Sequence, residues 1–466
     1  MTNHWANDAI FYHIYPLGLC GAPRRNDFHS PPAARLEQLY PWLDHIHTLG
    51  APEGAGLGCS ALYLGPLFES SAHGYDTADY FQVDRRLGDR QTLAALAKEV
   101  HRRGMRLVLD GVFNHTGRDF WAFKDVLANR ERSAYAGWFQ NLDFSRSSPY
   151  GDPFSYEGWA GHYDLVRLNL AHPDVRAHLF EAVRMWTDEF EIDGLRLDAA
   201  DQLAPDFVTA LVRHCRSLKS DFWLMGEIVF GDYRRLAAPA MLDSATNYEI
   251  YKSLYSSHND HNYFELAYAL NRQFGPDGIY CGLSLYTFAD NHDVDRVASV
   301  LKDPAHLYPL YCLLFTLPGI PSIYYGSEWG VAGQRSAWSD AALRPALDLR
   351  QTDSFPQPAL CEYIARLARL RRQCPPLQLG DYPLGCGGYE QLHVAAEQIA
   401  FLRSSPAGQV VVAVNAAAAP AALDLRLPIQ NGRLVDLLNP GAEFLIKNNQ
   451  ARIDIPPAWG RVLAIL

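Results

Sequence analysis

The sequence of 466 residues predicts an α/β fold whose main domain is a (β/α)8 TIM barrel, and three observations support this prediction. Eight short apolar runs, rich in β-branched and aromatic residues, recur over roughly the first 350 positions, which is typical of strands buried on both faces. Amphipathic helical segments separate several of these runs. Carboxylate side chains follow several of the runs, and a barrel of this kind places its active site at the C-terminal ends of its strands.

The eight predicted strands are Ile10–Tyr15, Ala61–Leu64, Arg106–Asp110, Gly194–Asp198, Phe222–Gly226, Leu242–Asn247, Tyr286–Asp290 and Pro321–Tyr325. One intervening helix is predicted to begin after Asp89, a suitable N-cap, and to end at Gly104. A second helix is predicted from Asp174, because apolar residues then recur on one face as far as Phe190.

Two departures from the alternation predict further domains. Residues 111–193 are more than one helix and two loops need, and residues 116–172 are rich in Gly, Pro, Tyr and Trp. We therefore predict an inserted domain B over 116–172, within a barrel domain A formed by 1–115 and 173–376. Short strands separated by Pro, Gly and Asn predict that domain C, residues 377–466, is an antiparallel β-sandwich.

The composition excludes several classes of partner. The formal net charge is −11, so binding to nucleic acid or to an anionic membrane surface is disfavoured. We find neither a leader-like N-terminal segment nor an apolar run of the roughly 18 to 20 residues that a membrane span needs. The eight cysteines are scattered singly, which predicts reduced thiols and a cytoplasmic protein.

The predicted strand ends carry a group of acids that a single helix cap or ion pair does not explain. Asp110, Asp198 and Glu227 end or follow three strands, and Asp293 follows a fourth. Arg196 lies two residues before Asp198 and so points to the same side of its strand, where it would keep a nucleophilic carboxylate ionised. Glu227 follows an apolar strand, where desolvation would favour the protonated form of a general acid. This pairing suits a retaining glycosidase, whose two carboxyl groups stand about 5–5.5 Å apart.

Four segments resemble the signature regions of the α-amylase family, glycoside hydrolase family thirteen, and they occur in the family's order and on the expected strands. They are Asp110-Gly-Val-Phe-Asn-His115, Gly194-Leu-Arg-Leu-Asp198, Gly226-Glu227-Ile228 and Phe288-Ala-Asp-Asn-His-Asp293. The resemblance extends over essentially the whole chain and implies the same order of barrel, domain B and domain C.

The resemblance also implies roles for individual residues. Asp198 matches the nucleophile, Glu227 the general acid/base and Asp293 the third carboxylate, which grips sugar hydroxyls. The other matching positions would bind sugar. Arg196, His115 and His292 would hold the sugar at the cleavage site, Tyr75 would stack on it, and Asp340 and Arg344 would bind the next sugar on the non-reducing side. Val229 and Phe230, just after Glu227, are placed to touch the leaving-group sugar.

Two further segments, Asp164–Asn169 and Met241–Tyr248, are similar to those of the neopullulanase and cyclomaltodextrinase branch. That branch implies an α-glycosidase acting mainly on α-1,4 bonds of small linear or cyclic maltooligosaccharides, such as cyclodextrins or cyclic maltosyl-maltose. The first predicted strand begins near Ile10, so we expect no N-terminal sandwich domain of the kind common there. In that branch the sandwich domain helps to form the dimer, so the resemblance leaves open whether this chain forms a homodimer.

Several alternatives stay open. Asp201-Gln202 stands where secreted amylases carry Lys-His at a calcium site, and Asn114 alone is a poor ligand set, so we expect no metal site and no required cofactor. The same carboxylates would serve an α-glucan transglycosylase, and a non-catalytic α-glucan-binding protein is a more remote reading. Trp121, Trp138 and Trp159 would either stack on distal sugars or, as we favour, form the core of domain B.

Overall fold

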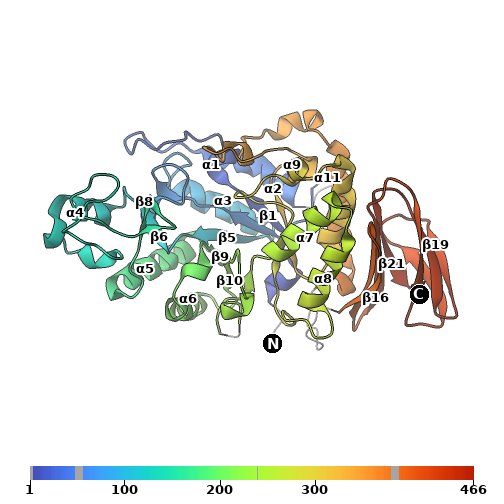
Figure 1. The fold of residues 1–466 in the computed structure, drawn as a ribbon. Helices are drawn as coiled ribbons and strands as arrows, with labels where there is room; N and C mark the ends of the chain where they lie inside the picture. The colour runs from blue at the N-terminus through green and yellow to red at the C-terminus, as the bar shows by residue number, and fades with distance from the viewer. Residues whose placement is uncertain (1–3, 48–55, 239, 379–387) are drawn as a thin grey trace.

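The computed structural model describes residues 4–47, 56–238, 240–378 and 388–466, and it confirms the (β/α)8 barrel (Figure 1). Eight parallel strands form the barrel sheet in the order β11-β10-β9-β5-β2-β1-β13-β12. Their bounds are β1 Phe11–Ile14, β2 Ala61–Leu64, β5 Arg106–Gly111, β9 Gly194–Leu197, β10 Trp223–Gly226, β11 Ser244–Ala245, β12 Tyr286–Phe288 and β13 Ile320–Tyr324. A bridge between Thr246 and Tyr286 joins the two ends of the sheet.

The barrel is filled by inward-facing rings and aliphatic side chains, as a strand buried on both faces requires. Phe11, Tyr63, Trp223 and Phe288 belong to one buried cluster inside the barrel. Every predicted strand is present, although the sixth is shorter than predicted: β11 spans two residues of the six in 242–247. Of the residues at its two ends, Leu242 forms a bridge with Ala237, and the Asn247 side chain caps the following helix.

The predicted helices form where their capping residues lie. The helix α3, Arg90–Arg102, begins after Asp89, whose carboxylate accepts a hydrogen bond from the backbone N–H of Thr92. The helix α5, Pro173–Phe190, begins one residue before the predicted Asp174, because the His172 ring is the N-cap. The remaining helices are α1 Pro16–Leu19, α2 Tyr40–Ile46, α4 Trp121–Asn129, α6 Pro205–Leu218, α7 Tyr248–Asn259, α8 Tyr263–Phe274, α9 Val297–Val300, α10 Leu307–Thr316 and α11 Pro358–Gln373.

Domain B projects from one end of the barrel (Figure 1). It holds α4 and a small sheet in the order β6-β8-β7, and the first strand of this sheet starts at His115, one residue before the predicted start of domain B. The bounds of these strands are β6 His115–Gly117, β7 Gly158–Trp159 and β8 His162–Arg167. A two-stranded sheet of β3, Phe68–Ser70, and β4, Thr77–Val83, follows strand β2 of the barrel.

Domain C lies at the opposite end of the barrel from domain B (Figure 1). Its eight antiparallel strands follow the order β14-β15-β16-β21-β18-β19-β20-β17. Alternate residues of β15 face two different cores: Phe401 joins the barrel cluster, and Leu402 joins the cluster inside domain C. The bounds are β14 Tyr389–Val394, β15 Gln398–Ser405, β16 Gly408–Asn415, β17 Ala421–Arg426, β18 Asn431–Asp436, β19 Glu443–Lys447, β20 Gln450–Ile455 and β21 Trp459–Ile465.

The prediction that all cysteines are reduced is wrong for one of them, since Cys281 is disulfide-bonded. Sequence spacing did not indicate this, because disulfide formation depends on the distance between Cα atoms in the fold. Six other cysteines are free thiols: Cys20, Cys59, Cys215, Cys312, Cys361 and Cys374. In the part of the chain that the structure describes, no helix is both long and apolar enough to cross a membrane.

Candidate active site

Arg196 is the centre of the candidate site and contacts three of the predicted carboxylates. Its Nη1 lies 2.9 Å from Oδ1 of Asp110 and 2.8 Å from Oδ1 of Asp198, and its Nη2 lies 2.8 Å from Oε1 of Glu227. These residues lie at the ends of the neighbouring strands β5, β9 and β10, which pair in register. The structure brings these predicted residues together, because parallel strands bring their C-terminal ends to one mouth of the barrel.

Asp110 is held more tightly than the other two carboxylates. The hydroxyl groups of Tyr63 and Tyr75 donate to its Oδ2 at 2.7 and 3.0 Å, and Arg196 covers its other oxygen. With both oxygens occupied, Asp110 serves to orient Arg196. Sequence reasoning missed Tyr63. Its position on the inward face of β2 was the available signal, since alternate residues of a barrel strand point inward.

Glu227 receives more polar contacts than its apolar strand suggested. The backbone N–H of Ala199 donates to its Oε2 at 3.0 Å, and the Tyr248 hydroxyl lies 3.4 Å from its Oε1. Ala199 has a left-handed backbone conformation, with φ 44°, and this directs its N–H toward the carboxylate. Together with Arg196, this N–H fixes the orientation of the Glu227 carboxyl group. The sequence did not show the turn at Ala199 or the approach of Tyr248.

Asp198 shares the Arg196 guanidinium with two other carboxyl groups, those of Asp110 and Glu227. Burial and the negative charges of Glu227 and Asp110 raise the pKa of Asp198 well above its usual range, although Arg196 acts in the opposite direction. Burial and like charge therefore disfavour the ionised form of Asp198 in the ligand-free site.

Asp293 belongs to a second charged network on the other side of the mouth. Its Oδ2 lies 2.8 Å from Nε2 of His292, and its Oδ1 lies 2.9 Å from Nη2 of Arg344. Although burial opposes ionisation, the charge and hydrogen bond of His292, together with Arg344, hold the pKa of Asp293 far below its usual range. Asp340 accepts from Arg344 at 3.4 Å and is paired with Arg335 at 2.8 Å. Arg335 was not predicted from the sequence.

The predicted ring partners lie between the two networks. Tyr75 stacks on His292 with a centroid distance of 5.4 Å and an interplanar angle of 11°, and their side chains also share a short hydrogen bond. The Nε2 of His115 is 3.9 Å from Oδ2 of Asp198. Burial and the charge of His73 lower the pKa of His115 to about 3, so this ring is neutral at physiological pH.

Phe230 is not brought into the carboxylate group. Its side chain is 83% exposed, and it makes no aromatic contact with another described residue. The tryptophans predicted for domain B separate into two groups. Trp138 is buried, and Trp121 packs edge-on against it, whereas the Trp159 ring lies beside His115.

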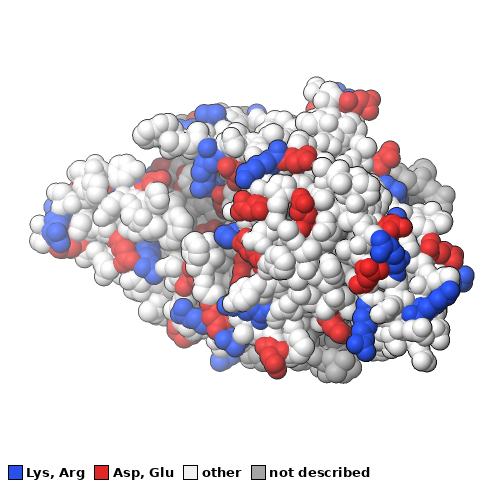
Figure 2. All heavy atoms as spheres, turned by 45° about the vertical axis from the view of Figure 1, so that its right-hand side comes forward, with Lys and Arg blue, Asp and Glu red and all other residues white. Residues whose placement is uncertain are grey.

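Neither the metal-ligating side chains nor the charged surface drawn in Figure 2 indicates a second functional site within the described ranges. In residues 4–47, 56–238, 240–378 and 388–466 there is no group of three or more His, Cys, Asp or Glu side chains that could hold a metal ion. Asn114 donates to the neighbouring His115 ring at 3.2 Å. On the face drawn in Figure 2, acidic and basic residues are intermixed, so this face offers no continuous basic surface to a polyanion.

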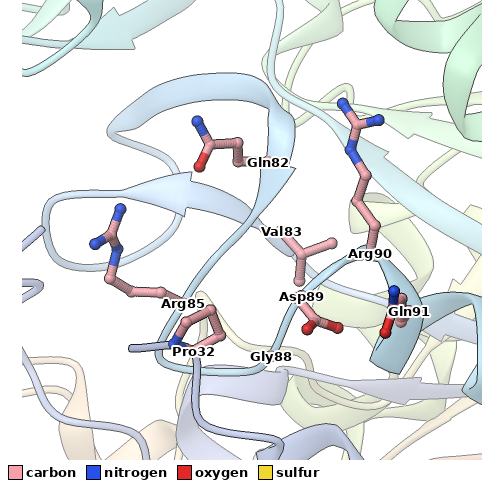
Figure 3. A pocket seen from close by; sticks show the side chains of 8 residues that line it. All are labelled: Pro32, Gln82, Val83, Arg85, Gly88, Asp89, Arg90 and Gln91. Carbon is pink, nitrogen blue, oxygen red and sulfur yellow. The ribbon is translucent and has the colours of Figure 1, made fainter. Parts of the chain in front are cut away.

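A hollow of about 520 Å³ lies away from these residues, where the loop after β4 meets the start of α3 (Figure 3). Its two arginines are already paired, Arg85 with Glu69 and Arg90 with Glu189. Asp89, which also lines it, caps the helix. This hollow therefore offers no free charged group, and the carboxylates around Arg196 are the candidate active site.

Comparison with known proteins assigns the chain to a family. The model of the alpha amylase catalytic domain matches residues 55–359. A cyclomaltodextrinase from a Bacillus species is 30% identical over 425 residues, which cover 88% of this chain and 73% of that protein. A cyclomaltodextrinase from Geobacillus thermopakistaniensis is 28% identical over 98% of this chain and 77% of its own length.

Solved structures agree with this assignment. The ligand-free cyclic alpha-maltosyl-(1→6)-maltose hydrolase from Arthrobacter globiformis superimposes with a TM-score of 0.81 and 26% identity, over 100% of both chains. The fold, the catalytic-domain match and these relatives lead to one conclusion. The chain belongs to the alpha-amylase family and is a glycosidase of that family.

Proposed function

We propose that this glycosidase cleaves α-glucosidic bonds, mainly α-1,4, in small maltooligosaccharides by double displacement with retention of configuration. Asp198 attacks the anomeric carbon, while Glu227 gives its proton to the oxygen of the leaving sugar. In the second step Glu227 removes a proton from water, the water oxygen bonds to the anomeric carbon, and the bond to Asp198 breaks to release the carboxylate. Asp293 binds hydroxyl groups of the same sugar, and Arg196, His115, His292 and Tyr75 surround it.

The observation that carries this proposal is the guanidinium of Arg196, which contacts Asp198 and Glu227 through adjacent nitrogens at 2.8 Å each. Two carboxylates bound to one planar group lie close together. This arrangement favours the separation of about 5–5.5 Å used for a covalent intermediate over the 6.5–9.5 Å that leaves room for a water molecule.

The relatives suggest the size and shape of the substrate. Two of them are cyclomaltodextrinases, and the structural neighbour that matches this chain from end to end hydrolyses cyclic maltosyl-maltose. We therefore propose small linear or cyclic maltooligosaccharides as substrates, with a cyclic maltosyl-maltose as the narrower choice. Asp340 and Arg344, paired with each other and linked to Asp293, would bind the neighbouring sugar.

The test is a product profile of the purified protein. Linear maltooligosaccharides, cyclodextrins, pullulan, cyclic maltosyl-maltose and starch are supplied in parallel, with and without chelator, and the products are separated by chromatography. We expect glucose and maltose from the short and cyclic substrates, little attack on starch, and no effect of the chelator. Products longer than the substrate would favour the transglycosylase alternative, and no cleavage of any α-glucan would contradict the proposed function.

A further inference from the structure

The hairpin of domain B that carries Trp159 is closed by a tight turn. Trp159 of β7 pairs with His162 of β8, and the turn between them, Ala160-Gly161, has φ angles of 49° and 84°. Two successive positive φ angles are typical of a type I′ turn, which matches the twist of paired strands. A Cβ on Gly158 would lie 2.4 Å from the carbonyl oxygen of His162, so only glycine permits this close pairing.

The Trp159 ring lies beside two histidine rings and is not part of the buried cluster that contains the domain B core. Its centroid lies 5.4 Å from that of His115, with an interplanar angle of 33°, and 6.0 Å from that of His162. Trp159 belongs to neither the barrel cluster nor the domain C cluster of buried side chains. Its indole N–H donates no hydrogen bond to any residue that the structure describes. A partly exposed aromatic ring with a free donor is typical of a ligand contact.

The neighbouring His115, like Trp159, has a ring nitrogen without a hydrogen-bond partner among the described residues. Its ring is 1% exposed, and its Nε2 has no hydrogen-bond partner among the described residues. Buried polar groups are normally paired, so an unpaired one requires an explanation. This nitrogen lies 3.9 Å from Oδ2 of Asp198, too far for a hydrogen bond but beside the carboxylate. A sugar that reaches Asp198 therefore passes His115 and comes within reach of the Trp159 indole.

We propose that Trp159 forms the domain B wall of the sugar site and contacts the glucose ring whose anomeric carbon Asp198 attacks. The indole packs on an apolar face of that ring, its N–H donates to a sugar hydroxyl, and Trp159 so helps to decide which sugars fit. This inference rests on the proposed function, since Asp198 identifies the ring. It adds a specificity-determining residue from the inserted domain to a site otherwise built from barrel loops.

The proposal is tested by removing the ring and measuring kcat and KM separately. Trp159→Ala is expected to raise the KM for maltotriose about tenfold and to leave kcat within about twofold, because the indole binds substrate and transition state alike. Trp159→Phe, which keeps an aromatic face, is expected to recover most of the loss. An unchanged KM in Trp159→Ala would overturn the proposal.

A binding measurement reports the contact directly. In an Asp198→Asn background, maltotriose is titrated while tryptophan emission is recorded, and we expect a change in emission that disappears when Trp159→Phe is added. The same change in both proteins would overturn the proposal, since a merely structural Trp159 would not report on the sugar.

The matched control is Trp121→Ala, which removes a domain B tryptophan that is 37% exposed and packs edge-on against Tyr135 and Trp138. It is expected to lower the melting temperature without changing KM. The activity of the wild-type protein distinguishes a failure of the proposed function from a failure of the inference about Trp159. If it cleaves no α-glucan, the proposed function and this inference both fail, whereas cleavage with the KM of Trp159→Ala unchanged overturns this inference alone.

Discussion

One guanidinium group, that of Arg196, contacts three carboxyl groups in this site, and Asp198 therefore shares its positive charge with two neighbours. Asp198 is 8% exposed, and the neighbouring carboxylates raise its pKa, so its ionised form costs free energy in the folded protein. Functional sites often keep such destabilising charges because the chemistry requires them. Replacing this carboxylate should therefore separate catalysis from stability.

Asp198→Asn is expected to lower kcat by about 10⁴-fold or more, because the amide cannot form the glycosyl intermediate. The nearly isosteric side chain should keep the fold. Residual turnover within about tenfold of the wild type, measured on freshly purified and fully folded protein, would contradict the role of Asp198.

The same variant should be more stable than the wild type at neutral pH and should have a higher melting temperature. A carboxyl group whose pKa is raised in the folded state loses stability as the pH rises from its unfolded pKa through its folded pKa. The difference should therefore shrink as the pH falls toward the ordinary carboxyl range. Melting curves at neutral and acidic pH check this, and a variant less stable than the wild type at neutral pH would contradict the charge balance.

Glu227→Gln should affect substrates according to their leaving groups. Natural maltooligosaccharides need a proton on the departing oxygen, so their kcat should fall by about 10² to 10⁴-fold. Aryl maltosides with acidic phenols need little protonation and should lose much less. Parallel kinetics on the two substrate types provide the measurement, and equal losses on both would argue against an acid role for Glu227.

At the scale of elements, the hairpin of β7 and β8 depends on the absence of a side chain at Gly158. Gly158→Ala should displace the hairpin, since the added Cβ would meet the His162 carbonyl group. We expect a fall of about tenfold in kcat/KM for maltotriose with little change in melting temperature, because the strand is short and partly exposed. Gly161→Ala, at the tip of the same turn with no atom within 4 Å of the added Cβ, is the control for backbone strain alone. Equal effects of the two substitutions would contradict a role for the close pairing at Gly158.

The elements that could be predicted are those whose signals are local. Asp198 and Glu227 were found because each follows a run of apolar residues, and Arg196 was found because side chains alternate along β9. The contacts that depend on the path of the chain could not be found in this way. The left-handed turn at Ala199 aims an N–H at Glu227, and the start of α7 brings Tyr248 to the same carboxylate.

The prediction for Phe230 also shows that a local pattern in the sequence does not fix the path of a loop. Its distance along the chain from Glu227 is short, yet its ring is exposed, and no local pattern in the sequence indicates this exposure. Arg344 and Asp340, which the sequence motif placed together, do lie within 3.4 Å of each other. Their link to Asp293 and to Arg335 depends on a loop whose course no local pattern indicates.

At the scale of the whole molecule, domain C is joined to the barrel by stacked aromatic rings. Trp459 of β21 stacks on Tyr308 of α10 at 5.2 Å and lies 4.9 Å from Tyr363 of α11. Its indole N–H also donates to Asn439 at 2.7 Å. Domain B lies at the other end of the barrel, so this joint and the sugar-contacting hairpin are far apart (Figure 1).

Trp459→Ala should therefore weaken the molecule without altering the site. We expect a loss of about 2 kcal/mol in the free energy of unfolding, since the ring is partly buried, and an unchanged kcat/KM at about 25 °C. Trp459→Phe should retain most of the stability. Calorimetry and steady-state kinetics on the three proteins provide the comparison, and a loss of activity well below the melting temperature would show that domain C influences the site.

The central claim, double displacement through a close pair of carboxyl groups, is tested most directly by the anomeric configuration of the first product. Proton NMR spectra are recorded in the first minutes of hydrolysis of the best substrate from the product profile. Retention predicts that the new reducing end appears first as the α-anomer, with the β-anomer following only by mutarotation. A β-anomer that appears first would mean inversion, which requires carboxyl groups about 6.5–9.5 Å apart and contradicts the assignment of Asp198 as nucleophile.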